Sequence, residues 1–342
     1  MSEMSVVVAG GCGFIGSHFI RLLLSACPDA RILNLDLLTY AGNPANLADL
    51  ATAPGLAFSR CDIADPDAVR SALTAWNVTP RYVVNLAAET HVDRSVLEPE
   101  SFLRTNVLGT YTLLELCRGI PGVRFVQVST DEVYGSLGGA GCFNEDSPLL
   151  PSSPYSASKA SSDMLVRAWH KTYGLDAVIT RSSNNYGPNQ FPEKLIPLMI
   201  LHASSGQELP VYGDGSNVRD WIHVVDHCVG ILAAMRQGRA GGIYNFGGDS
   251  ERTNLQVVNS IVDRICGHRD LIRFVPDRPA HDWRYALDSS RARSELGWRP
   301  EVRFEQGLSE TIDWYLANDA WWRPILTGEY LRFREQWYGA RR

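Results

Sequence analysis

The chain has 342 residues, 45% of them hydrophobic, and a formal net charge of −6. This length accommodates one large α/β domain, or a main domain with a smaller partner. Acidic and basic residues are interspersed, which argues against a nucleic-acid-binding surface, and no apolar stretch is long enough to span a membrane.

The first half of the chain alternates short β-branched runs with amphipathic segments. The predicted strands are 6–9, 31–36, 57–62, 82–87, 124–129 and 176–181. The predicted helices are 15–25, 66–76, 102–119 and 158–173. Apolar strands separated by helix-length segments are typical of β-α-β units around a parallel sheet. We therefore predict an α/β fold, a Rossmann-type doubly wound parallel sheet with a smaller C-terminal substrate-binding lobe.

The character of the chain changes after about Pro188, where proline and glycine become frequent. We predict that residues 1–188, with parts of 220–250, form the main domain and that 189–342 largely form the lobe. The seven cysteines are scattered without a C-x-x-C pair, which favours reduced thiols. A strand pattern within the first ten residues leaves no room for a signal peptide. We therefore expect a cytoplasmic protein.

A glycine-rich turn links the first predicted strand to the first predicted helix. Gly10, Gly13 and Gly16 follow G-x-x-G-x-x-G, a spacing that lets the backbone approach a pyrophosphate at a helix N-terminus. Asp36 ends the next strand, where a carboxylate can accept both ribose hydroxyls and would repel a 2′-phosphate. Asp62 ends the third strand and Ile63 follows it, near the expected adenine. The pattern predicts NAD as the cofactor, in preference to NADP.

Tyr155 and Lys159 form a Y-x-x-x-K pair, whose spacing puts both side chains on one helical face. We expect the lysine ammonium to lower the pKa of the phenol, so that the tyrosine takes a proton from a sugar hydroxyl. Thr130, at a strand end, could hold the same substrate oxygen. His223 and His227 are four residues apart, but no further ligand cluster accompanies them, and we expect no metal.

These residues together resemble the extended short-chain dehydrogenase/reductase family. Within that family the chain is similar to the nucleotide-sugar 4,6-dehydratases, especially those that act on dTDP-glucose. The similarity is carried by L-T-Y-A-G-N, L-A-A-E-T-H-V-D-R-S, S-T-D-E-V-Y-G, S-N-N-Y-G-P, F-P-E-K-L-I-P-L-M-I, R-D-W and R-P-A-H-D, nearly from end to end.

The resemblance implies a redox-neutral dehydration by a hydro-lyase with tightly bound NAD. Tyr155 would deprotonate the C4 hydroxyl while NAD takes the C4 hydride. Glu132 would then remove the C5 proton, and Asp131 would protonate the departing C6 hydroxyl. Return of the hydride to C6 gives a 4-keto-6-deoxy sugar nucleotide. Such chemistry needs one protonated and one ionised acid, which adjacent positions with different surroundings can provide.

The resemblance also implies the residues of each binding site. The catalytic residues would be Thr130, Asp131, Glu132, Tyr155 and Lys159. The cofactor residues would be Gly10, Gly13, Phe14, Ile15, Gly16, Asp36, Leu37, Leu38, Thr39, Asp62, Ile63, Leu86, Ala87, Ala88, Thr105, Tyr155, Lys159 and Asn185. The substrate residues would be Thr90, Thr130, Asn184, Lys194, Leu195, Pro210, Val211, Tyr212, Arg219, Asn254, Arg278 and His281.

Alternatives remain at this stage. Departures from the usual motifs at Asn85, Ser182, Ala280, Trp283 and in P-N-Q-F border the nucleotide pocket, so the base could be that of UDP- or CDP-glucose, or the hexose could be modified. The chain could also be a UDP-glucuronate decarboxylase, a nucleotide-sugar 4-epimerase or an NAD-sensing module. The helices at 102–118 and 158–173 resemble those that form a four-helix homodimer interface in relatives.

Overall fold

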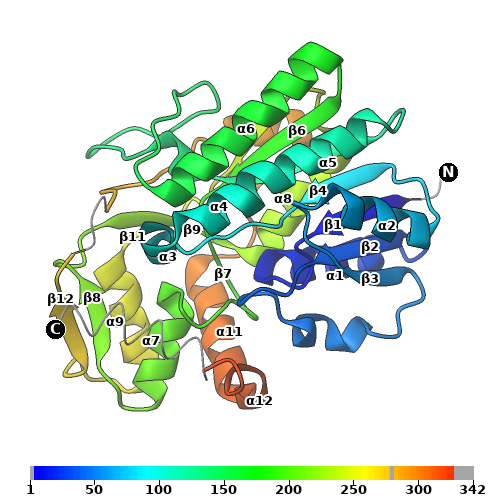
Figure 1. Ribbon diagram of the computed structural model, residues 1–342. Helices are drawn as coiled ribbons and strands as arrows, with labels where there is room; N and C mark the ends of the chain where they lie inside the picture. The colour runs from blue at the N-terminus through cyan, green and yellow to red at the C-terminus, as the bar shows by residue number, and fades with distance from the viewer. Residues whose placement is uncertain (1–3, 278–280, 327–342) are drawn as a thin grey trace.

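A seven-stranded sheet forms the centre of the computed structural model, which describes residues 4–277 and 281–326 (Figure 1). Its strand order is β10-β6-β5-β4-β1-β2-β3, and every neighbouring pair is parallel. The strands are β1 (Ser5–Ala9), β2 (Arg31–Asp36), β3 (Leu56–Arg60), β4 (Tyr82–Asn85), β5 (Arg124–Thr130), β6 (Asp176–Ser182) and β10 (Ile243–Phe246). The predicted Rossmann-type fold is confirmed.

Helices cover both faces of this sheet, because successive strand residues point to opposite sides. Val6 and Val8 of β1 pack with α1 (Phe14–Ala26) and α8 (Val224–Gln237). Val7 packs on the other face with α2 (Pro66–Trp76), α5 (Gly109–Arg118) and α6 (Pro154–Tyr173). Apolar cores therefore cover both faces of the central strands.

A second lobe contains two small sheets and three packed helices. The order of the first sheet is β11 (Glu251–Thr253), β9 (Val218–His223), β7 (Asn184–Tyr186), and the second pairs β12 (Ile272–Val275) with β8 (Leu209–Tyr212). The helices α7 (Leu195–Ser204), α9 (Asn254–Ile265) and α11 (Phe304–Ala317) share one apolar core beside them. In Figure 1 this lobe lies beside the main sheet rather than on either of its covered faces.

The remaining described elements are short. They are η1 (Pro44–Leu50), α3 (Val92–Leu97), α4 (Pro99–Phe102), η2 (Leu103–Leu108), η3 (Asp131–Tyr134), α10 (Ser290–Leu296) and α12 (Asp319–Trp322). Within the described residues, no helix combines the length and the apolar character that crossing a membrane requires.

Two predicted helices differ from the structure. α6 begins at Pro154 rather than at residue 158, because Ser153 caps it through a reciprocal hydrogen-bond pair with Ser156 and proline suits the first helical position. The predicted helix 102–119 is divided, since Leu103–Leu108 forms a π-helical segment before α5. The earlier start of α6 places Tyr155 inside the helix, one turn before Lys159.

Candidate active site

The glycine-rich turn lies at the carboxyl end of β1, where the sheet order reverses between β1 and β4. Such a reversal opens a crevice for ligands in doubly wound folds. A Cβ on Gly10, which has φ +82°, would lie 2.6 Å from the backbone nitrogen of Ala87. A Cβ on Gly16 would lie 2.1 Å from the carbonyl oxygen of Gly10. Only glycine therefore permits this tight junction, which leaves the N-terminus of α1 open to an anion.

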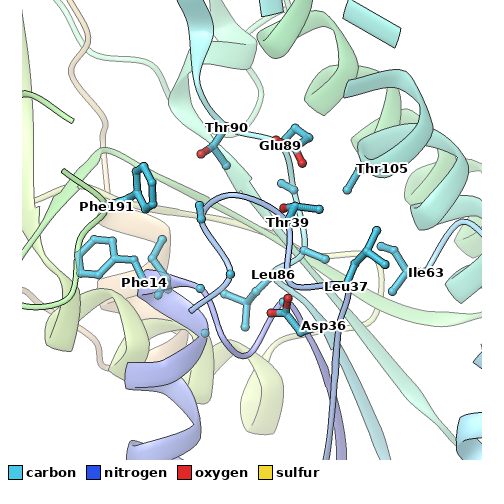
Figure 2. Close-up of a pocket in the computed structure, with 18 of the residues that line it drawn as sticks. Phe14, Asp36, Leu37, Thr39, Ile63, Leu86, Glu89, Thr90, Thr105 and Phe191 are labelled. Carbon is cyan, nitrogen blue, oxygen red and sulfur yellow. The ribbon is translucent and has the colours of Figure 1, made fainter. Parts of the chain in front are cut away.

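A cleft of about 1030 Å³ begins at this turn. Asp36 lines it, and its two carboxylate oxygens accept hydrogen bonds from the backbone amides of Cys12 and Leu38, each at 2.8 Å. Each oxygen has two lone pairs, so capacity remains for ribose hydroxyls. Figure 2 shows Leu37 and Ile63 on one side of the cleft and Phe14 and Phe191 on the other. The glycine cradle, the carboxylate and these apolar walls fit a dinucleotide.

Most of the predicted cofactor residues line this cleft. They are Gly10, Gly13, Phe14, Ile15, Gly16, Asp36, Leu37, Thr39, Asp62, Ile63, Leu86, Ala87, Ala88 and Thr105. Four predicted residues do not line it. Leu38 packs against the apolar core, and Asn185 bonds to Ser182 and to the ring of His227. Tyr155 and Lys159 lie on α6, deeper in the protein.

A second cleft, of about 940 Å³, joins the first at Thr90, Glu193 and Lys194, which line both. The predicted substrate residues that line the second cleft are Thr90, Asn184, Lys194, Leu195, Pro210, Val211, Tyr212, Arg219, Asn254 and His281. Thr130 does not line it, and its hydroxyl caps η3. Arg278 and Ala280 lie outside the described residues. The structure thus brings together segments that are far apart in the sequence.

Several buried polar atoms in this region have no hydrogen-bond partner among the described residues. They include Oδ1 of Asn184 and Nε1 of Trp221, both on residues that line the second cleft, and Oδ2 of Asp131 beside it. An unpaired buried polar atom costs about 1–3 kcal/mol, so most such atoms have partners in native proteins. An acceptor, a donor and a carboxyl oxygen of this kind fit a polyhydroxylated ligand.

Tyr155 and Lys159 are both buried on one face of α6, and the Lys159 ammonium donates to the carbonyl oxygen of Val128 at 2.8 Å. Burial lowers the pKa of Lys159 to about 8. Burial, followed by the charge of Glu132, raises the pKa of Tyr155, and a hydrogen bond with Thr130 opposes the shift. The lowered pKa predicted for this phenol is therefore not found, because burial and the nearby carboxylates raise it.

Asp131 and Glu132 occupy different environments although they are adjacent. Asp131 is 2% exposed, whereas Glu132 lines the second cleft. Burial raises the pKa of Asp131 well above its usual range, the charges of Glu132 and Asp220 add to this effect, and Arg219 opposes it. Asp131 therefore holds its proton more firmly than an ordinary aspartate, beside a carboxyl group open to ligand.

Comparison with known proteins identifies the family. A family model described as GDP-mannose 4,6 dehydratase matches residues 7–311. The dTDP-glucose 4,6-dehydratase of Streptomyces niveus is 48% identical, and the alignment covers 94% of this chain and 96% of that protein. The chain belongs to the dTDP-glucose 4,6-dehydratase family.

Solved structures of this family agree with the fold. The Streptomyces venezuelae dTDP-glucose 4,6-dehydratase, solved with NAD bound, has a TM-score of 0.91 and 49% identity. The Bacillus anthracis dTDP-glucose 4,6-dehydratase, in complex with NAD, has a TM-score of 0.88 and 46% identity. Each comparison covers 94% of this chain and 100% of the other. The predicted resemblance is confirmed.

Glu193 and Tyr285 are among the residues of the second cleft that the sequence did not predict. Glu193 is buried where the clefts meet, and it accepts hydrogen bonds from Tyr40 at 2.9 Å and from Arg94 at 3.4 Å. Glu193 lies inside the F-P-E-K motif, so this motif could have identified it. Tyr285 lines the cleft with its ring 4.4 Å from the guanidinium carbon of Arg219. No local pattern marks Tyr285, because only the fold brings it to Arg219.

Proposed function

We propose that this protein converts dTDP-glucose to its 4-keto-6-deoxy derivative and water, with NAD as a cofactor that is regenerated in each turnover. The observation that carries the proposal is the contrast between buried Asp131, whose pKa is raised, and cleft-lining Glu132. Elimination of water needs one group that gives a proton and one that takes it. Membership of the family adds to this support.

In the proposed reaction, Tyr155 takes the proton of the C4 hydroxyl, and Lys159 and Thr130 orient the oxygen. Bound NAD supplies a cationic nicotinamide, which favours a nearby phenolate, accepts the C4 hydride and later returns it to C6. The C4 ketone acidifies the C5–H bond, and Glu132 takes that proton. Asp131 protonates the C6 hydroxyl, which leaves as water, and a proton returned to C5 completes the balance.

We assign the two parts of the chain different ligands. Residues 1–188, with parts of 220–250, would hold the dinucleotide, and 189–342 would largely hold the sugar nucleotide. Arg219 suits the diphosphate, since a guanidinium offers paired donors. Lys194, Leu195 and Tyr212, with Pro210 and Val211, would line the nucleoside end of the second cleft. All seven cysteines are free thiols, which supports a cytoplasmic location.

One assay tests both the reaction and the nucleobase of the substrate. Purified protein is incubated with dTDP-glucose, UDP-glucose, CDP-glucose and UDP-glucuronate, and the products are identified by mass. We expect one water to be lost from dTDP-glucose without net reduction of NAD, faster than from the UDP and CDP analogues. Loss of carbon dioxide from UDP-glucuronate, a 4-epimer from UDP-glucose, or inertness towards all four would contradict the proposal.

We further propose a homodimer built on a four-helix bundle. Large apolar side chains are exposed on the two adjoining helical segments, Leu103 and Leu108 on η2 and Met164 and Tyr173 on α6. Exposed apolar side chains on neighbouring helices are typical of an interface. We expect Leu103→Asp to give a monomer in analytical ultracentrifugation, whereas Phe58→Asp, at an equally exposed position on β3, should leave the dimer intact. A wild-type monomer would contradict the proposal.

A further inference from the structure

A buried ion pair lies behind the proposed catalytic residues and takes no part in the steps above. Nε of Arg181, on β6, donates to Oδ2 of Asp163, on α6, at 2.8 Å. The two side chains are 1% and 0% exposed. Asp163 is one helical turn beyond Lys159, so Tyr155, Lys159 and Asp163 share one buried face of α6.

Arg181 also contacts the turn that carries the two acids. Its Nη1 donates to the hydroxyl of Tyr134 at 2.8 Å, and that hydroxyl donates to Oδ1 of Asn245 at 2.8 Å. Tyr134 is the last residue of η3, the turn that begins with Asp131. Arg181 and Asn245 are register partners on β6 and β10. A continuous hydrogen-bonded chain therefore runs from α6 through the sheet to η3.

Stability alone is a poor explanation for this pair. Desolvation of two charges usually offsets their attraction, and apolar replacements of buried pairs are often neutral or stabilising. Oδ1 of Asp163 and Nη2 of Arg181 have no hydrogen-bond partner among the described residues, so the pair is not optimised for its own energy. The planar guanidinium of Arg181 nevertheless contacts α6 and η3 at once, which the compact ammonium of a lysine could not do as well.

Asp163 also bears on the charge of Lys159. Burial lowers the pKa of that lysine, and the carboxylate of Asp163 acts in the opposite direction. The same carboxylate that anchors Arg181 thus favours the ammonium form of Lys159. The pair influences both the helix that carries the oxidation residues and the turn that carries the elimination residues.

We propose that the Asp163–Arg181 pair is a positioning device that holds α6 in register with η3. The inference rests on the proposed function: oxidation at C4 uses Tyr155 and Lys159 of α6, and elimination across C5 and C6 uses Asp131 and Glu132 of η3. The oxidation residues and the elimination residues must act in turn on the same sugar while it stays bound. The link through the Tyr134 hydroxyl keeps their separation fixed between the two steps.

Tyr134→Phe removes this link and keeps the ring, which stacks on Phe143 at 5.0 Å. Tyr244→Phe is the matched control, because Tyr244 is also buried on the sheet and its hydroxyl bonds to Glu295, away from η3. The assay follows reduced nicotinamide by absorbance and 4-keto-6-deoxy product by mass in single turnovers of dTDP-glucose. It separates oxidation from elimination.

We expect Tyr134→Phe to slow elimination about tenfold or more, since small misplacements of reacting groups are costly. Oxidation should change less than about threefold, the size of an ordinary peripheral substitution. Reduced nicotinamide should therefore accumulate in Tyr134→Phe and not in Tyr244→Phe. If wild type and Tyr134→Phe accumulate the same proportion of reduced nicotinamide relative to product, the inference is overturned.

Hydrogen exchange gives a second readout that needs no substrate. We expect amides of residues 131–135 to exchange faster in Tyr134→Phe, while those of β1 and α1 remain unchanged, because local opening reports local contacts. Unchanged exchange at 131–135 would overturn the positioning role. This measurement decides the role even if wild-type protein leaves dTDP-glucose intact, a result that would instead overturn the proposed function.

Discussion

Lys159→Met should make the protein more stable and less active. The variant replaces a buried ammonium with an apolar side chain of similar length. The fall in the Lys159 pKa from 10.5 to about 8 corresponds to about 3 kcal/mol, at 1.36 kcal/mol per pKa unit. Loss of the hydrogen bond to Val128 destabilises the variant by about 1 kcal/mol, so we expect its free energy of unfolding to increase by about 2 kcal/mol at pH 7.

The pH dependence of this gain follows from the sign of the shift. Between about pH 8 and pH 10.5 the unfolded chain holds the lysine proton and the folded chain does not, so wild-type stability rises there. The advantage of Lys159→Met should be complete below pH 8 and lost by about pH 10.5. Wild-type kcat should fall as pH rises past about 8, because the ammonium that orients the substrate oxygen is discharged.

Urea unfolding at pH 7 and pH 10, with kcat measured in parallel, tests this prediction. Lys171→Met is the control, because Lys171 is exposed on the same helix and its loss should change stability by less than about 1 kcal/mol. We expect kcat of Lys159→Met to fall at least about a hundredfold. A variant that is less stable than wild type at pH 7, or equally favoured at both pH values, would refute the reasoning.

Three further variants test the assignment of roles. Glu132→Gln should still permit oxidation at C4 but slow product formation about 10²–10⁴-fold, so the absorbance of reduced nicotinamide should rise, and normal elimination would exclude Glu132 as the base. Asp131→Asn should also lose elimination. The raised pKa of the Asp131 carboxyl group makes the folded wild-type protein bind more protons than the unfolded chain above pH 3.8, so wild-type stability falls as pH rises. The variant should therefore be more stable than wild type to urea at pH 8 but not at pH 3. Asp36→Asn should raise the ratio of NADP to NAD affinity about tenfold in calorimetric titration, since one repulsive charge is removed, and an unchanged ratio would contradict our assignment of Asp36.

Local sequence patterns predicted the elements that depend on local forces. The bounds of β2 were predicted correctly, because an apolar run between turns specifies a buried strand. The start of α6 was missed, since the cap depends on a serine pair that resembles an ordinary loop. The predicted pKa of Tyr155 failed for a different reason. Spacing places Lys159 nearby, but the burial that raises the phenol pKa comes from the whole fold.

The contrast between the two acids has its origin in the geometry of η3. A 3₁₀ turn has three residues per turn, so side chains of neighbouring residues point about 120° apart. One of two adjacent acids can therefore face the protein beside Asp220 and Arg219, while the other faces the cleft. The Thr130 hydroxyl fixes this orientation by accepting from the amide of Glu132 at 3.3 Å. A slip of one residue would move one carboxyl group into the environment of the other and displace the second from the pair, which is why the anchoring of this turn matters as much as the identity of its acids.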